Sequence, residues 1–176
     1  MSPDGYRALV VNVLKHMSSA MVEIFFDGAF KSMSDLVTSR QTFGHNPHAL
    51  YVADATVQEC TKRGGLYDAT KPMFSGKHKA YYLKTEVEVQ PSGQAIYVTP
   101  HWLGSVHDMT IFRSQQSRHV QLMTKSANKI ENIPDLGPMN QKYPNQWSIL
   151  LDKGYDGASS LVRTITPKKY ARAYNG

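Results

Sequence analysis

Two aspartates, Asp54 and Asp152, are the residues of this 176-residue chain whose type and setting best fit catalytic chemistry. Both lie in short apolar runs, ALYVADATV and WSILLDKGY, which predict largely buried strands. An ionised carboxylate removed from water must find a partner or lose its charge. If the two strands are neighbours, a divalent cation between the carboxylates would relieve their repulsion, and Mg²⁺ or Mn²⁺ suits such oxygen ligands. Such a site could activate water and stabilise both the attacking and the leaving oxygen of a phosphodiester.

A structural explanation of the same residues stays open. Each aspartate could accept a hydrogen bond from a loop amide or pair with a lysine such as Lys153. Asp108, in the segment GSVHD, could help to shape a metal site. It also stands three residues after Ser105, the spacing of a capping box, which would explain it without chemistry. Spacing alone does not separate these possibilities.

An N-terminal helical segment, residues 1–43, precedes the predicted sheet. Apolar residues recur at helical intervals over residues 9–25, which predicts an amphipathic helix with one buried stripe. A second helix or a kinked extension continues to about Ser39. Asp4 lies early in the segment and Lys15 breaks its apolar run, so neither a signal peptide nor a membrane span is expected.

A β-hairpin is predicted in the middle of the chain. Residues 80–90, AYYLKTEVEVQ, alternate in polarity as a half-buried strand does. The polar face of this strand carries Lys84, Glu86 and Glu88, and the opposite face carries aromatic and aliphatic side chains. The connection Pro91-Ser92-Gly93 provides glycine where a three-residue hairpin needs a left-handed residue, and a return strand follows it.

The second half of the chain completes the predicted sheet. Residues 105–125 predict an amphipathic helix, and residues 126–146 predict a surface loop. The strand that ends at Asp152 is followed by a short helix that Asp156 could cap. The order strand, hairpin, helix, strand and helix is satisfied by an α/β fold with a mixed sheet flanked by helices. This fold would place Asp54 and Asp152 toward strand ends.

The composition is that of a folded domain with a basic surface. Hydrophobic residues make up 41% and charged residues 19% of the chain, and the net charge is +6. A basic excess favours a polyanionic partner such as nucleic acid but does not require one. Lys77, Lys79 and Lys84 near the hairpin, and Lys153 beside Asp152, could contact phosphates or simply be solvated.

Cysteine and histidine usage argues against a conventional zinc site. The single cysteine, Cys60, excludes an internal disulfide and fits a reducing compartment. Neither His45 with His48 nor His101 with His107 has a cysteine or acid that completes a tetrahedral set at familiar spacing. We therefore expect a soluble intracellular protein without zinc at these histidines.

Four sequence blocks, taken together, resemble one protein family. In chain order they are YVADATVQEC, FSGKHKAYYLKTEVEVQPSGQAIYV, GSVHDMTIFR and ILLDKGYDG. They are similar to the DDE superfamily endonucleases of Harbinger-type transposases, from about Leu50 to Lys169. The resemblance implies an RNase H-like fold and metal-dependent cutting and joining of DNA in the nucleus by a two-metal mechanism. It also implies that Asp54 and Asp152 are catalytic metal ligands, that Asp108 is a further site residue, and that the cofactor is Mg²⁺ or Mn²⁺.

The chain departs from the family pattern after its second aspartate. The family carries its third acid, a glutamate, on a helix some distance after the DKGY block, whereas no acid follows Asp156 here. Asp156 itself lies too close to Asp152 for that role. Residues 44–176 are therefore expected to form a partial RNase H-like nuclease domain that lacks its C-terminal elements and its third acid.

The family's usual N-terminal helix-turn-helix is not evident either. A separate DNA-binding protein or a homo-oligomer could supply sequence-specific binding. Two functions stay open at this point. One is a DNA endonuclease core that uses Asp54, Asp152 and a divalent metal. The other is a catalytically inactive, transposase-derived module that binds DNA or protein.

Overall fold

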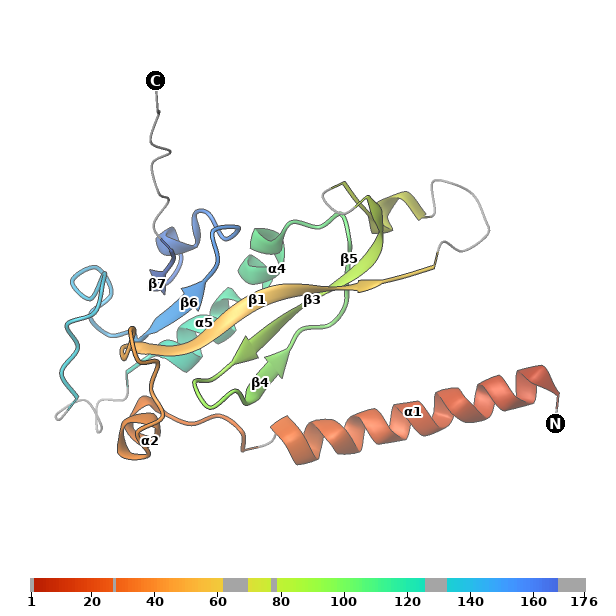
Figure 1. Cartoon of the computed structure of the whole chain (residues 1–176), viewed down its shortest axis with the longest axis horizontal. Coiled ribbons are helices and arrows are strands. Elements are labelled where there is room, and N and C mark those ends of the chain that lie inside the picture. Colours follow the sequence, from red (N-terminus) through yellow and green to blue (C-terminus); the bar gives the residue numbers. More distant parts are fainter. Residues whose placement is uncertain (1, 27, 62–69, 77–78, 126–132, 168–176) are drawn as a thin grey trace, which may run out of the picture.

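The computed structural model describes residues 2–26, 28–61, 70–76, 79–125 and 133–167. The strands in this part of the chain join in one seven-stranded sheet, which is flanked by helices, and a long N-terminal helix extends away from it (Figure 1). In chain order the elements are α1 (Pro3–Phe26), α2 (Met33–Thr38), β1 (Ala49–Glu59), η1 (Lys71–Met73), β2 (Phe74–Ser75), β3 (Ala80–Val89), β4 (Ala95–Val98), β5 (Trp102–Leu103), α4 (Asp108–Ser114), α5 (Gln116–Met123), β6 (Ser148–Leu151), η2 (Ala158–Ser160) and β7 (Thr164–Ile165).

The sheet combines antiparallel and parallel strands. β3 is antiparallel to β1 on one side and to β4 on the other. On the far side of β1, β6 runs parallel to β1, and β7 runs parallel to β6. The short strands β2 and β5 also pair with β3. This order confirms the predicted mixed sheet flanked by helices, and it is consistent with an RNase H-like fold.

The core lies between the central strands and helices α4 and α5. Tyr51 and Ala53 of β1, Leu151 of β6, Phe112 of α4 and Met123 of α5 are buried in one cluster. The first three residues of β1 are all buried in succession, so this end of the strand is covered on both faces. The double cover explains why the start of β1 is continuously apolar and does not alternate.

The predicted hairpin is confirmed, but the prediction of its solvated face is wrong. Gly93 has φ +84° and its N–H donates to the carbonyl of Gln90 at 2.8 Å, which closes the turn between β3 and β4. Glu86 and Glu88, expected in solvent, are completely buried. Their face of β3 is the one that α4 and α5 cover, and α5 supplies charged and polar partners to the two acids.

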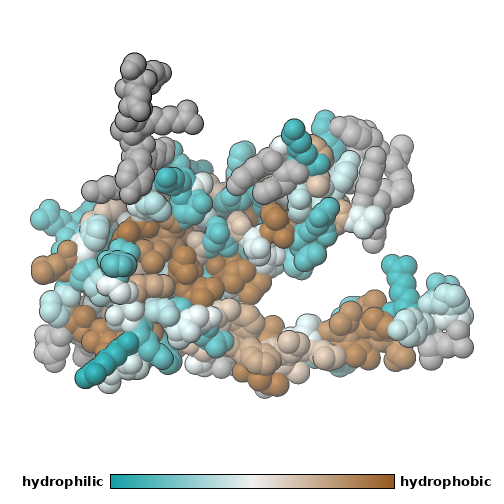
Figure 2. Space-filling view, viewed as in Figure 1, coloured by the Kyte–Doolittle hydropathy of each residue, from teal (hydrophilic) through white to brown (hydrophobic). Residues whose placement is uncertain are grey.

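Helix α1 forms as predicted but does not bury its apolar stripe. Leu14, Met17 and Ile24 are 59%, 52% and 71% exposed, and Figure 2 shows the apolar surface of the helix. Its C-terminal end meets the hairpin, where Gln94 donates a hydrogen bond to the carbonyl of Phe25 at 3.1 Å. Among the described residues, α1 is the one helix that is long and apolar enough to cross a membrane by length and composition. The expected absence of a membrane span therefore stays a prediction.

The predicted capping box at Ser105 and Asp108 is wrong. Helix α4 begins at Asp108 after His107, whose side chain makes no capping hydrogen bond. Lys84 approaches from β3 instead, and its Nζ donates to Asp108 Oδ1 at 3.0 Å and to the carbonyl of Val106 at 2.8 Å. The carboxylate of Asp108 is thus oriented by a lysine from the sheet and not by the start of its own helix.

The helices predicted around the last strand also differ from the structure. The helix expected over residues 105–125 is divided at Gln115 into α4 and α5. The short helix expected after Asp156 is the 3₁₀ turn η2, with Gly157 and not Asp156 at its N-cap. Gly157 has φ +89°, a left-handed conformation that glycine adopts without strain. The chain then enters β7, which pairs with β6.

A buried ion-pair network anchors the segment before β6. Arg163 is fully buried and donates from both terminal nitrogens to the carboxylate of Asp135, while Lys125 Nζ lies 2.6 Å from the same group. Burial alone would raise the pKa of Asp135. The hydrogen bonds from Arg163 and Lys125 outweigh this effect and hold the pKa well below its usual range.

The Asp135 network should make stability depend on pH in acid. A carboxyl group with a lowered folded-state pKa stabilises the fold above its unfolded pKa of about 4, and this contribution is lost as the pH falls through the lower value. We expect Asp135→Asn to reduce the melting temperature near neutral pH, with a difference from wild type that shrinks below about pH 4. Thermal melts between about pH 7 and pH 2 measure this difference. A difference that does not change with pH would contradict the role given to Asp135.

Candidate active site

Asp54 and Asp152 stand next to each other where the parallel pairing of β1 with β6 ends. Ala53 of β1 pairs with Leu151 of β6, and an aspartate follows each of these residues. Asp152 follows the carboxyl end of β6, where ligands commonly bind in such sheets, whereas β1 continues past Asp54 to Glu59, so the prediction that Asp54 lies toward a strand end is wrong. Both aspartates are exposed, whereas their apolar surroundings in the sequence predict burial. The structure thus brings the two acids together at a position that solvent and substrate can reach.

Asp108 lies close to Asp152, beside Gly154. A Cβ atom placed on Gly154 would stand 3.0 Å from Asp152 Oδ1 and 3.7 Å from Asp108 Oδ2, so both carboxylates border the same glycine. The backbone N–H of Gly154 donates a hydrogen bond to Asp152 Oδ1 and orients it. A larger residue at position 154 would press on the Asp152 carboxylate, which explains the glycine in the segment DKGY.

Tyr155 connects the exposed acids to the interior. Its hydroxyl donates a hydrogen bond to Glu86 Oε2 at 3.1 Å. Burial raises the pKa of Tyr155, and the negative charges of Glu86, Asp54 and Asp108 raise it further. The hydroxyl therefore keeps its proton and stays a donor to Glu86. Because Asp54 and Asp108 both act on this one hydroxyl, they lie in the same region of the domain.

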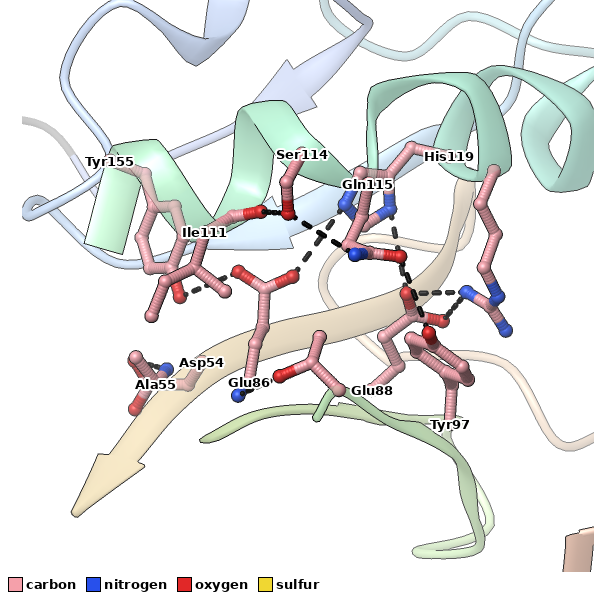
Figure 3. Close-up of polar contacts among 12 residues, drawn as sticks. Asp54, Ala55, Glu86, Glu88, Tyr97, Ile111, Ser114, Gln115, His119 and Tyr155 are labelled. Carbon is pink, nitrogen blue, oxygen red and sulfur yellow. Dashed lines mark hydrogen bonds and ion pairs between the residues drawn. The ribbon is translucent and has the colours of Figure 1, made fainter. Parts of the chain in front are cut away.

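A second group of polar residues lies inside the core, where the sequence did not predict one. Glu86 and Glu88 of β3 and His119 of α5 are completely buried, and one ligand atom from each lies within 4.8 Å of the others (Figure 3). We call these three residues the core cluster. Burial raises the pKa of Glu88, and Arg118, which donates to both carboxylate oxygens, opposes the rise. The core cluster could hold a metal ion.

The sequence contained one signal for the core cluster. His119 follows Phe112 by seven residues, or two helical turns, a spacing that puts both on one side of a single helix. Their rings do stack, with centroids 4.3 Å apart. A histidine in a core needs a polar partner, but the alternation within β3 does not reveal which face a helix will cover. The partners Glu86 and Glu88 were therefore assigned to the wrong side.

Residues 53–174, which include every residue of this site, match the family model described as DDE superfamily endonuclease. The chain belongs to the DDE superfamily endonucleases. Membership makes the mixed sheet an RNase H-like DDE fold, and it implies DNA as the substrate and a divalent metal ion as the cofactor. No curated protein and no solved structure gives a significant match to the chain.

The three aspartates of this DDE endonuclease suit the divalent metal ion that membership of the family implies. Asp54, Asp108 and Asp152 offer only oxygen donors, which Mg²⁺ and Mn²⁺ prefer. The core cluster also offers a nitrogen donor, and it is completely buried. A phosphodiester cannot reach the core cluster in this structure, so the two groups of residues are suited to different tasks.

The lysines predicted to contact DNA occupy different settings in this DDE endonuclease. The Lys84 side chain is 14% exposed, and its amino group donates hydrogen bonds to Asp108 and to the carbonyl of Val106. Lys79 and Lys153 are exposed, and Lys153 directly follows Asp152. Lys77 lies outside the described residues. Phosphate binding by these lysines stays a prediction.

Proposed function

We propose that this DDE endonuclease is the catalytic domain of a Harbinger-type transposase, which cuts phosphodiester bonds in DNA and joins the ends to new sites. Asp54 and Asp152 would be the catalytic acids, with Asp108 as a third oxygen ligand. The parallel pairing of β1 and β6 carries the proposal, because it sets the two aspartates side by side at an exposed edge. Residues 44–176 would form the nuclease domain, which would act on DNA in the nucleus.

Each residue at this edge would have a definite task. A divalent ion held there would help to activate water and stabilise charge on the phosphodiester oxygens. The Gly154 amide fixes the orientation of Asp152, and Lys84 fixes that of Asp108. Lys153, exposed beside Asp152, would bind a DNA phosphate and help to position the strand.

The acid set within residues 1–176 is small for a two-metal mechanism. The related transposases carry a third acid, a glutamate, after the DKGY segment. Residues 157–176 contain no Asp or Glu and so have no counterpart of it. Two or three carboxylates suffice to bind one divalent ion, whereas two ions normally need more ligands. We therefore expect metal binding by this chain to be more readily measured than DNA cleavage.

The proposal is tested by nicking of supercoiled plasmid DNA and by calorimetric Mn²⁺ binding with the same purified chain. Mg²⁺ or Mn²⁺ is expected to convert supercoiled plasmid to nicked circles, and EDTA is expected to prevent this conversion. DNA binding is followed in parallel as a function of salt, because log affinity falls as log salt rises, and each phosphate contact makes this fall steeper by about 0.9. Salt-sensitive DNA binding without nicking in either metal would favour a non-catalytic DNA-binding module. A chain that neither binds Mn²⁺ nor nicks DNA would refute the proposal.

A further inference from the structure

The core cluster contains two polar atoms that the protein leaves unsatisfied. Glu86 Oε1 and His119 Nε2 are buried, and neither makes a hydrogen bond with any residue that the structure describes. The two atoms lie 3.6 Å apart, which is too long for a normal hydrogen bond. Because buried polar groups are nearly always satisfied, two such atoms in one cluster indicate a site for a ligand.

Each unsatisfied atom belongs to a side chain whose other polar atom is held by a tyrosine. Tyr155 donates to Glu86 Oε2 at 3.1 Å, and the Tyr51 hydroxyl lies 2.8 Å from His119 Nδ1. Figure 3 shows the Glu86 carboxylate and the His119 ring directed toward each other from β3 and α5. Metal-bound histidines usually have their second ring nitrogen hydrogen-bonded in this way, which fixes the ring and leaves the first nitrogen for the metal.

Glu88 is the third possible ligand of the core cluster. Its Oε1 lies 3.5 Å from His119 Nδ1, the ring nitrogen that Tyr51 also contacts, so a metal on Nε2 would draw the Glu88 carboxylate toward that nitrogen. One ligand atom from each member of the core cluster lies within 4.8 Å of the others. Arg118 donates to both oxygens of Glu88, and its guanidinium lies 3.8 Å from the ring centroid of Tyr97. A carboxylate oxygen has more than one lone pair, so the contact with Arg118 orients Glu88 and still allows it to bind a metal.

We propose that Glu86, Glu88 and His119 form a buried zinc site, distinct from the group formed by Asp54, Asp108 and Asp152. Zn²⁺ accepts a histidine nitrogen together with carboxylate oxygens at about 2.1 Å, and two tetrahedral ligands at that distance stand about 3.4 Å apart. The 3.6 Å between His119 Nε2 and Glu86 Oε1 is close to this spacing. Mg²⁺ and Ca²⁺ prefer larger sets of oxygen ligands, and Mg²⁺ keeps several waters, so a closed site with a nitrogen donor suits neither.

The zinc ion would stabilise the domain and would not act on DNA. Its ligands are completely buried and join strand β3 to helix α5. Through Tyr155, Glu86 is also linked to the loop that carries Asp152. The inference does not depend on the proposed DNA-cutting function, because the two sets of metal ligands share no residue.

The test uses the full chain with Asp54→Asn and Asp152→Asn, which removes the proposed catalytic ligands and leaves the core cluster intact. After metal is removed with a chelator, Zn²⁺ at about a hundredfold above its Kd is expected to raise the melting temperature by about 5–10 °C. One equivalent of Co²⁺, added to the metal-free chain in place of Zn²⁺, is expected to show the visible absorption of a cobalt ion with few ligands.

Two variants of this parent chain remove one ligand each. Glu86→Gln and His119→Gln are each expected to weaken Co²⁺ binding at least about tenfold and to abolish the Zn²⁺-dependent melting shift. Glu59→Gln, an exposed change on β1, is the matched control and is expected to leave both unchanged. The zinc site would be overturned if the parent shows no Co²⁺ absorption, or if Zn²⁺ raises the melting temperature of Glu86→Gln as much as that of the parent. Glu86 and His119 would then be a pair that shares a proton. If neither ligand variant folds, the metal content of the purified parent decides: about one zinc per chain supports the site, and none overturns it.

Discussion

Asp152→Asn is expected to reduce metal-dependent nicking of DNA by about a hundredfold or more. Asparagine keeps the size of the side chain and an oxygen that can accept the hydrogen bond from Gly154, but it removes the negative charge. A divalent ion contributes several kcal/mol to transition-state stabilisation, and about 1.4 kcal/mol corresponds to a tenfold change in rate. Asp54→Asn is expected to have the same effect, because its carboxylate would share the ion. Single-turnover nicking rates and Mn²⁺ affinity measure the losses.

The matched control for these variants is Asp156→Asn. Asp156 is exposed, lies four residues after Asp152 and changes the net charge by the same amount when it is replaced. It is expected to leave the nicking rate within about twofold of wild type, since small surface changes rarely alter function or stability. An Asp152→Asn chain that keeps more than about a tenth of wild-type nicking would remove Asp152 from the catalytic set.

Phe112→Ala is expected to lower the free energy of unfolding by about 3–5 kcal/mol, a large share of the roughly 5–15 kcal/mol of a typical domain. Phe112 is fully buried, and its ring stacks on His119 and meets Tyr155 edge-on at 5.6 Å between centroids. Alanine would leave a cavity where the helix, the core cluster and the Asp152 loop meet. Urea denaturation followed by tryptophan fluorescence, in the presence of a chelator, measures the loss.

Phe74→Ala provides the comparison for this change. Phe74 lies on the short strand β2, is 40% exposed and packs edge-on against Tyr81 at 5.5 Å between centroids. Its removal is expected to cost less than about 1 kcal/mol, because little buried volume is lost. Equal effects of the two substitutions would show that Phe112 does not hold the core together as its contacts indicate.

Much of the fold could be predicted because its signals are local. The alternation of residues 80–90 and the glycine at position 93 were enough to predict the hairpin, and the apolar runs before Asp54 and Asp152 were enough to predict two strands. The resemblance of four short blocks pointed to the DDE endonuclease family, which the match over residues 53–174 confirms. Each of these signals depends on neighbouring residues along the chain and on little else.

Other features depended on which elements meet in space. The alternating pattern of β3 fits burial of either face, and only the packing of α5, with Arg118 and His119, decides that Glu86 and Glu88 are inside. The stripe on α1 has the spacing of a buried helix, but no described element covers most of it, and its apolar residues are exposed. Ser105 and Asp108 have the spacing of a capping box, yet the Asp108 carboxylate accepts a hydrogen bond from Lys84 of β3 instead.

The sequence by itself determined the family, the order of the main strands and the two aspartates that lie in apolar runs, because these follow from residue types and from periods of two or about four residues. Only the tertiary structure decided that Asp54 and Asp152 are neighbours, that Asp108 borders the same glycine, and that a second polar cluster lies in the core. The register between two strands, and the face of a strand that a helix covers, depend on how two elements fit together. The periodicity within one segment carries no information about that fit.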